Sequence, residues 1–218
     1  MSLIPKDLTP VLQATLQKGA GATRWQHPAW IDHLPPCNAA CPAGENIQAW
    51  LEKAQAGDFE GAWRTLVADN PMPAVHGRAC YHPCEGGCNR GALDEAVAIH
   101  AVERFLGDEA ARNGWTVAPG AATGRRVLVI GAGPAGLSAA WHLRRLGHAV
   151  EIRDASPEPG GMLHYGIPAS RLPRDVLARE IARIAAMGVT FTMGTRVDDV
   201  EAAMAAGGFD AAFVAIGA

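Results

Sequence analysis

The spacing of apolar residues along the chain changes near residue 118. Before that point, apolar residues recur every three or four positions in short segments, as they do in amphipathic helices. One segment begins at the N-cap residue Asn46, the next stops before Pro71, and a third begins at Asp94 and ends at Gly114. This pattern predicts a small helical domain in the first half of the chain.

Beyond this point, continuous apolar runs alternate with helical segments. The run RVLVIG at 126–131 predicts a strand that is buried on both faces of a parallel sheet. A helix that ends at Gly147 and a strand at 149–154 follow, and then a further helix and two further strands. The order β-α-β predicts an α + α/β fold, with a helical domain over 1–118 and a parallel-sheet domain over 119–218.

Composition and charge narrow the classes of function. The chain has 218 residues, of which 49% are hydrophobic and 19% charged, as in an ordinary globular protein. The formal net charge of −3 gives no reason to expect a nucleic-acid partner. The N-terminus has no apolar segment of signal-peptide length and no apolar run reaches a membrane span, so we expect a cytoplasmic protein without a membrane partner.

The cysteines gather in the helical half of the chain. There are five, an odd number, which argues against a framework of disulfides in a cytoplasmic protein. Three of them are spaced four apart in CYHPCEGGCNRG, where Pro83 and the pair Gly86–Gly87 disfavour a continuous helix. We therefore predict a loop that carries sulfurs, and a metal or cluster role for the five. They are Cys37, Cys41, Cys80, Cys84 and Cys88.

A glycine-rich motif, GAGPAG, follows the first predicted strand and opens the next helix. In this context it predicts a dinucleotide-binding turn, in which Gly131 allows a tight turn, Gly133 lets a pyrophosphate approach, and Gly136 permits close packing. Pro134 and Ala135 complete the turn, where the helix N-terminus favours phosphate. The parallel-sheet domain is therefore predicted to be Rossmann-like.

An acidic residue stands at the end of the second predicted strand, as the motif requires. Asp154 would accept hydrogen bonds from the ribose hydroxyls of the adenosine. It argues against a 2′-phosphate on that ribose, whereas the neighbouring Arg153 favours one. The pattern of residues therefore leaves the choice between FAD and NAD(P) open.

Three stretches of the sequence resemble one known family. PEPGGMLHYGIPASRLPRDVL, at 157–177, resembles the segment after the second strand in flavoproteins of the glutamate synthase small-subunit family. CNAACPAGENIQAWL, at 37–51, and GRACYHPCEGGCNRG, at 77–91, resemble the iron–sulfur domain of that family, which dihydropyrimidine dehydrogenase shares. The resemblance spans residues 37–218.

The resemblance implies an electron-transfer oxidoreductase. In this family, FAD takes electrons from NAD(P)H, and [4Fe-4S] clusters pass them to a larger partner subunit or domain. The resemblance assigns Gly161 and Arg171 to the flavin site, and it implies no catalytic acid, base or nucleophile, because the cofactors carry the chemistry. It places the NAD(P)H site in a domain beyond Ala218, so we expect this chain to be a fragment, or to be completed by a second polypeptide.

The cysteine pattern departs from that of the family. Two cysteines of its first motif correspond to Ala29 and Asp32, neither of which supplies a thiolate. The remaining matches give one cluster with three cysteines and an acid on the following helix, and leave two cysteines for a second cluster. The first set is Cys41, Cys80, Cys84 and Glu103, and the second is Cys37 and Cys88. We predict one [4Fe-4S] cluster, with His27, Asp32 or His33 as candidates to complete another.

Two alternatives remain open from the sequence. Four of the cysteines, Cys41, Cys80, Cys84 and Cys88, could instead hold a structural zinc ion. The chain could then be a non-redox binding or assembly module with an empty or NAD(P)-binding half-domain. The colour of the protein separates these alternatives, because an iron–sulfur cluster is brown and zinc is colourless.

Overall fold

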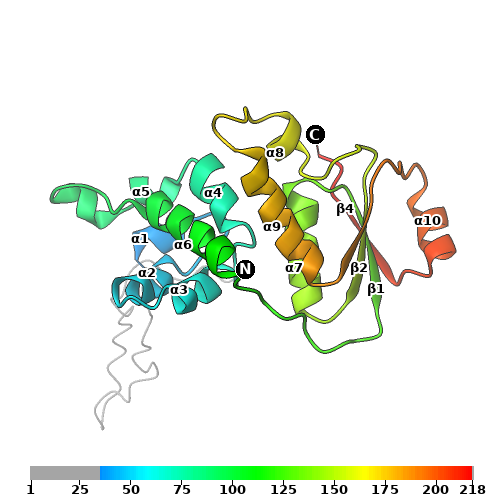
Figure 1. Cartoon of the computed structure of the whole chain (residues 1–218), viewed down its shortest axis with the longest axis horizontal. Helices are drawn as coiled ribbons and strands as arrows, with labels where there is room; N and C mark the ends of the chain where they lie inside the picture. Colours follow the sequence, from blue (N-terminus) through cyan, green and yellow to red (C-terminus); the bar gives the residue numbers. More distant parts are fainter. Residues whose placement is uncertain (1–34, 218) are drawn as a thin grey trace, which may run out of the picture. The chain divides into compact units, whose positions relative to one another are not determined.

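The structure is a computed structural model that describes residues 35–217 (Figure 1). In this range, helices come first and a sheet follows, as predicted. The helical part contains α1 (Pro36–Ala40), α2 (Ile47–Gln55), α3 (Phe59–Leu66), α4 (Pro73–Ala79), α5 (Pro83–Gly86) and α6 (Ile99–Asn113). A short 3₁₀ turn, η1 (Asn89–Ala92), joins α5 to the segment before α6.

Helices α2 and α3 begin at acceptor side chains, as the sequence predicts. The Asn46 side chain accepts a hydrogen bond from the backbone N–H of Ala49, and the Asp58 side chain caps α3 in the same way. Each cap satisfies a backbone donor that a helix N-terminus leaves without a partner. The two helices bury Trp50 and Trp63 completely, so these side chains form the centre of the helical core.

Helix α6 begins later than predicted. We expected it to start at Asp94, but it starts at Ile99. The Asp94 carboxylate is bound instead to the Arg90 guanidinium, at 2.6 and 2.8 Å, and to the backbone N–H of Glu95 at 2.7 Å. These local bonds compete with helix formation. The predicted end is correct, because Gly114 adopts the left-handed conformation with φ +65°.

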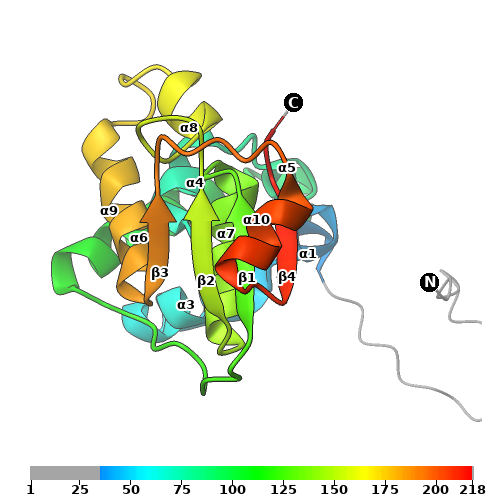
Figure 2. The same ribbon diagram turned by 90° about the vertical axis from the view of Figure 1, so that its right-hand side faces the viewer.

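The second part is a four-stranded parallel sheet with the order β3-β2-β1-β4 (Figure 2). Its elements are β1 (Arg126–Ile130), α7 (Pro134–Arg145), β2 (Ala149–Arg153), α8 (Met162–Tyr165), α9 (Arg174–Ala186), β3 (Val189–Thr192), α10 (Val200–Gly207) and β4 (Ala211–Val214). Helices α7 and α9 cover one face of the sheet and α10 lies on the other (Figures 1 and 2). The α + α/β fold class is thus confirmed.

The sheet topology places the glycine-rich turn at a reversal of strand order. Strand β1 lies between β2 and β4, and its last four residues are buried. Ligands of open parallel sheets bind at the carboxyl ends of the strands, where the order reverses. The turn that begins at Gly131 directly follows β1, so it lies at this position.

The helical part packs against α7 and α9 of the Rossmann-like part. Helix α4 contacts α9, and the indole N–H of Trp141 donates to the carbonyl of Val67 at 3.1 Å. The Arg183 guanidinium lies over the rings of both Trp63 and Trp141, 5.4 and 5.0 Å from their centres. Pro35–Ala218 form one compact unit, and the predicted boundary at residue 118 stays a prediction. None of the described helices has the length and apolar character needed to cross a membrane.

Candidate functional site

The turn after β1 can be built only with glycine at two of its positions. Gly131 has φ +113°, and a Cβ atom there would lie 2.1 Å from the carbonyl oxygen of Ala215. A Cβ atom at Gly136 would lie 1.9 Å from the carbonyl oxygen of Gly131. Helix α7 therefore begins in close contact with the strand, as the motif predicts.

The middle glycine of the turn faces open space. A Cβ atom at Gly133 would meet only the Cα atom of Gly161, at 4.0 Å. Gly161 itself has φ +51°, and a Cβ atom there would lie 2.8 Å from the Cα of Gly133. The structure thus brings together two predicted site residues that are far apart in the sequence, and it leaves room beside Gly133 for a phosphate group.

The N-terminus of α7 has backbone donors for such a group. Its N-cap is Gly133, which has no side chain to cap the helix, and Pro134 occupies the first turn. The first N–H groups of a helix have no partner within it, and the helix dipole adds positive charge at this end. Gly133, Pro134 and Ala135 therefore form a cradle suited to a pyrophosphate.

Asp154 ties the glycine turn to the end of β2. One carboxylate oxygen accepts from the backbone N–H of Ala132 at 2.6 Å, and the other accepts from the N–H of Ser156 at 2.7 Å. Burial alone would raise the pKa of this carboxyl, but these donors outweigh it and hold the pKa below its usual value. The carboxylate therefore stays charged at the edge of the cradle, where contact with a ribose remains our prediction.

Arg171 contacts the end of α4 and the residue after Cys80. Its Nε donates to the carbonyl of Arg78 at 3.3 Å, and its guanidinium lies 5.9 Å from the centre of the Tyr81 ring. Tyr81 follows Cys80 directly, so Arg171 contacts the segment that carries the cysteines. Its predicted role at a flavin is not tested by these contacts.

Three cysteines gather at one end of the helical part. Cys41 follows α1, Cys80 follows α4, and Cys84 lies within α5. The pKa of Cys84 is raised to about 12, mainly by burial and in part by Cys41 and Cys80. Burial is also the main cause of the raised pKa of Cys80, to which Cys41 contributes. Helices α1 and α5 contact each other, so Cys41 and Cys84 lie in neighbouring elements, and the shared ligand role of the three cysteines stays a prediction.

His82 connects the cysteine segment to Glu103. It adopts a left-handed conformation with φ +49°, and its backbone N–H donates to the Cys80 sulfur at 3.3 Å. Its Nε2 lies 3.2 Å from one carboxylate oxygen of Glu103, and this contact is the main cause of the raised pKa of His82. Glu103 on α6 is only 4% exposed. His82 thus connects the predicted carboxylate to the segment of Cys80 and Cys84, and the role of Glu103 as a ligand stays a prediction.

The two other cysteines have different surroundings. Cys88 receives backbone N–H groups of Val97 and Arg90, which lower its pKa, and no other cysteine is among the causes of that shift. Cys37 lies on α1, which packs against α5. Glu103, and not Cys88, stays our prediction for the ligand that accompanies Cys41, Cys80 and Cys84. His27, Asp32 and His33 lie outside the described residues.

The donor set fits an iron–sulfur cluster in its chemistry. Thiolates are the usual ligands of such clusters, and a carboxylate is one of the charged side chains that can complete the set. Among residues 35–217, no three His, Cys, Asp or Glu side chains already surround a common metal position. The residues therefore fit one cluster by the kind of donor that they supply, and binding would draw them together and remove the thiol protons.

A buried polar network surrounds Glu103 that the sequence analysis did not identify. Asn70 donates to Glu45 at 2.9 Å and to Glu103 at 2.6 Å, and His76 bonds to its side-chain oxygen. Burial is the main cause that raises the pKa of Glu45 to about 7, and Glu103 adds to it. These residues lie in different elements with no shared motif, so no local pattern marks them.

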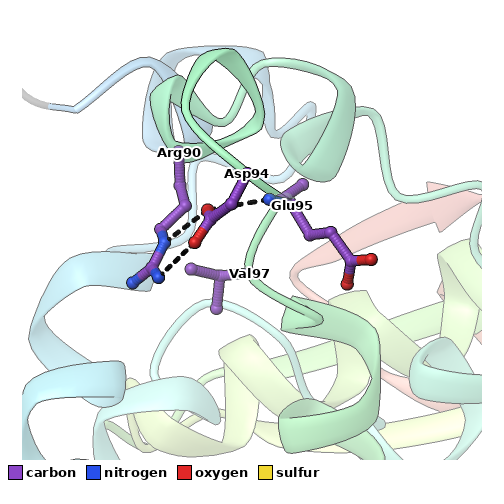
Figure 3. Close-up of a pocket in the computed structure, with 5 residues that line it drawn as sticks. Arg90, Asp94, Glu95 and Val97 are labelled. Atoms are coloured by element: carbon purple, nitrogen blue, oxygen red, sulfur yellow. Dashed lines mark hydrogen bonds and ion pairs between the residues drawn. The ribbon is translucent and has the colours of Figure 1, made fainter.

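A surface pocket of about 420 Å³ lies elsewhere, beside the segment that precedes α6 (Figure 3). It is lined by Arg90, Asp94, Glu95, Ala96 and Val97, all of them exposed. The Arg90–Asp94 ion pair forms part of its wall. None of the predicted cofactor or metal residues lines this pocket, so we assign no function to it.

Comparison with known protein families agrees with both candidate sites. Residues 32–115 match the family described as dihydropyrimidine dehydrogenase domain II, 4Fe-4S cluster. Residues 129–172 match the NAD(P)-binding Rossmann-like domain family. The chain joins a 4Fe-4S domain to an NAD(P)-binding domain. The first match contains all five cysteines and Glu103, and the second contains the glycine turn and Asp154.

Curated relatives belong to the predicted group of oxidoreductases. The NADP(+)-dependent formate dehydrogenase subunit beta of Moorella thermoacetica is 38% identical over 92% of this chain and 32% of its own length. The NAD-dependent dihydropyrimidine dehydrogenase subunit PreT of Escherichia coli is 39% identical over 88% and 46%. The glutamate synthase [NADPH] small chain of Bacillus subtilis is 34% identical over 83% and 37%.

The resemblance to these oxidoreductases is therefore confirmed, and this chain combines a region that matches a 4Fe-4S domain with a region that matches an NAD(P)-binding Rossmann-like domain. It spans less than half the length of these three relatives. The 4Fe-4S match and the relatives favour the redox function over the zinc-binding assembly module.

Proposed function

We propose that this module passes electrons between a bound FAD and a single [4Fe-4S] cluster, on the way from NAD(P)H to a larger partner subunit. The carrying observation is that His82, which lies between Cys80 and Cys84, contacts the buried carboxylate of Glu103 and donates its backbone N–H to the Cys80 sulfur. The open cradle at Gly133 supports a dinucleotide in the same compact unit. Electrons would thus enter and leave through one compact unit.

The cofactors supply the one- and two-electron chemistry, and the protein residues position them. The N-terminus of α7 and the turn at Gly133 would hold the pyrophosphate, and Asp154 would keep the turn in shape. On the other side, three thiolates and the Glu103 carboxylate would hold the cluster. His82 would donate its backbone N–H to the Cys80 sulfur, which stabilises a negatively charged thiolate.

The choice of FAD rests on the relatives and on the stretch 157–177. The segment after β2 folds back so that Gly161 lies against Gly133, and the N–H of Gly160 donates to the carbonyl of Ala132 at 2.8 Å. This arrangement closes one side of the cradle. NAD(P)H would then bind at a second site, which we expect outside residues 1–218.

A larger partner subunit is the proposed destination or source of the electrons. Names of the relatives include a subunit beta and a small chain, each of which denotes one part of a larger assembly. Which substrate that assembly acts on is not decided by the residues of this chain. The proposal therefore concerns electron transfer and not a particular final reaction.

The assignment of the cluster ligands can be tested by paired serine substitutions. The double variant Cys80→Ser, Cys84→Ser should lose the electron paramagnetic resonance signal of the dithionite-reduced protein, because two of four cluster ligands are removed. The double variant Cys37→Ser, Cys88→Ser should keep it. FAD released by acid from both variants serves as the control, because the cradle is far from either pair in the sequence. Loss of the signal in the second double variant alone would contradict the assignment.

A further inference from the structure

The segment between α3 and α4, residues 67–72, contacts both halves of the molecule; we call it the Asn70 segment. Its backbone carbonyls face the Rossmann-like part. Val67 accepts from the indole of Trp141, Ala68 accepts from the Arg145 guanidinium, and Pro71 accepts from the Arg183 guanidinium. Three side chains from α7 and α9 therefore fix the position of this backbone.

The Asn70 side chain points toward the candidate cluster ligands. It is 1% exposed, and its two amide hydrogens serve two carboxylates, Glu45 and Glu103. Its oxygen accepts from the backbone N–H of Met72 at 3.1 Å and lies 2.6 Å from the Nδ1 of His76. This orientation of the amide is the only one that gives each carboxylate a donor, because the reverse would place its oxygen against them.

The contacts of Glu103 show which oxygen Asn70 controls. Asn70 binds Oε1 at 2.6 Å, whereas the other oxygen, Oε2, makes the longer 3.2 Å contact with His82. His82 belongs to the segment between Cys80 and Cys84, so Oε2 is on the side of the thiols. A carboxylate anchored through one oxygen presents the other one in a fixed direction.

We propose that Asn70 is a positioning residue for the cluster, which orients the Glu103 carboxylate toward the site of Cys41, Cys80 and Cys84 from a segment held by the Rossmann-like part. This inference rests on the proposed function, because it requires a cluster at that site. It adds a residue outside the ligand set and a physical connection between the two halves. In many proteins, hydrogen-bond partners outside the ligand set fix the orientation of the metal ligands.

The test compares anaerobically purified wild-type protein with Asn70→Asp and Asn70→Ser. Asparagine and aspartate have nearly the same shape, but aspartate donates no hydrogen bond, whereas serine keeps one donor. We expect Asn70→Asp to release iron to a ferrous chelator about tenfold faster than the wild type. Metal sites typically weaken by about this factor when a ligand loses its hydrogen-bond partner. The rate of iron release from Asn70→Ser should lie between the rates of Asn70→Asp and the wild type. The resonance line shape of the reduced cluster should change in the same order.

A matched control separates positioning from a general loss of packing. Asn113→Ala removes an exposed asparagine on α6, the helix that carries Glu103, and should leave both readouts unchanged. If Asn70→Asp does not fold, the comparison of Asn70→Ser with the wild type tests the inference. Line shapes and release rates equal to those of the wild type in the folded Asn70 variants would overturn the inference and leave the proposed function intact. An iron-free wild-type protein would reject the proposed function itself.

Discussion

At the scale of single residues, each glycine of the turn after β1 has its own role. Gly131 and Gly136 are required by the backbone, whereas Gly133 has φ −77° and space for a side chain. A larger residue at Gly133 should therefore leave the fold intact and fill the space proposed for a pyrophosphate. This difference makes Gly133 the position at which binding can be tested without unfolding the protein.

We predict that Gly133→Val loses its dinucleotide while the cluster is retained. The valine side chain would occupy the cradle, but it contacts none of the cysteines. Flavin released by acid should fall to background, and iron per chain should equal that of the wild type, which serves as the internal control. A variant that kept flavin at wild-type occupancy would show that the cofactor binds elsewhere.

The sequence predicted site residues wherever a short motif marks them. The turn at Gly131 and the spacing of Cys80 and Cys84 are local patterns, and the match to the family located Glu103. Asn70 carries no such mark, since its partners Glu45 and Glu103 lie 25 and 33 positions away in the chain. Contacts of this kind are created by packing between elements, and a single sequence does not show them.

At the scale of elements, most helices with a clear apolar period were predicted, whereas the shortest helices and α10 were not. Helices α2, α3, α7 and α9 and the strands lie where the apolar pattern placed them. Helices α1, α4, α5 and α8 have only four to seven residues, too few to show a helical period. In the stretch 80–91 the expected loop contains α5, a single turn that starts at Pro83.

Helix α9 carries a buried ion pair that should affect stability. Glu180 is 3% exposed and binds Arg183, which lies between Trp63 and Trp141. Burial raises the pKa of Glu180 from 4.5 to about 6, although Arg183 lowers it in part. The folded state thus holds the proton more tightly than the unfolded state. The stabilising effect of this proton on the folded state is complete below pH 4.5 and is lost as the pH rises through about 6.

We predict that Glu180→Gln has a flatter pH profile of unfolding free energy than the wild type. The free energy of unfolding of the wild type should fall by about 2 kcal/mol as the pH rises through the pKa of Glu180. The variant should not show this decrease, because a glutamine does not ionise. Urea unfolding between pH 4.5 and 7 measures the difference. Glu201→Gln, an exposed change on α10, is the control. Parallel profiles for Glu180→Gln and the wild type would contradict the assigned pKa.

At the scale of the whole molecule, the two halves meet through side chains of one half and backbone carbonyls of the other. Trp141, Arg145 and Arg183 donate to the Asn70 segment, and Arg171 donates to Arg78. The change of pattern near residue 118 predicted the two kinds of structure but not their contacts. The packing therefore adds what the sequence could not provide, a set of hydrogen bonds that joins the half with the dinucleotide cradle to the half with the candidate cluster.

The central claim is that one [4Fe-4S] cluster occupies the site of Cys41, Cys80, Cys84 and Glu103. Iron and acid-labile sulfide, measured per chain in the anaerobically purified protein, test it most directly. We predict about four of each, in a brown protein that loses them in air. Stoichiometric zinc without iron or sulfide would contradict the claim and favour a structural metal site.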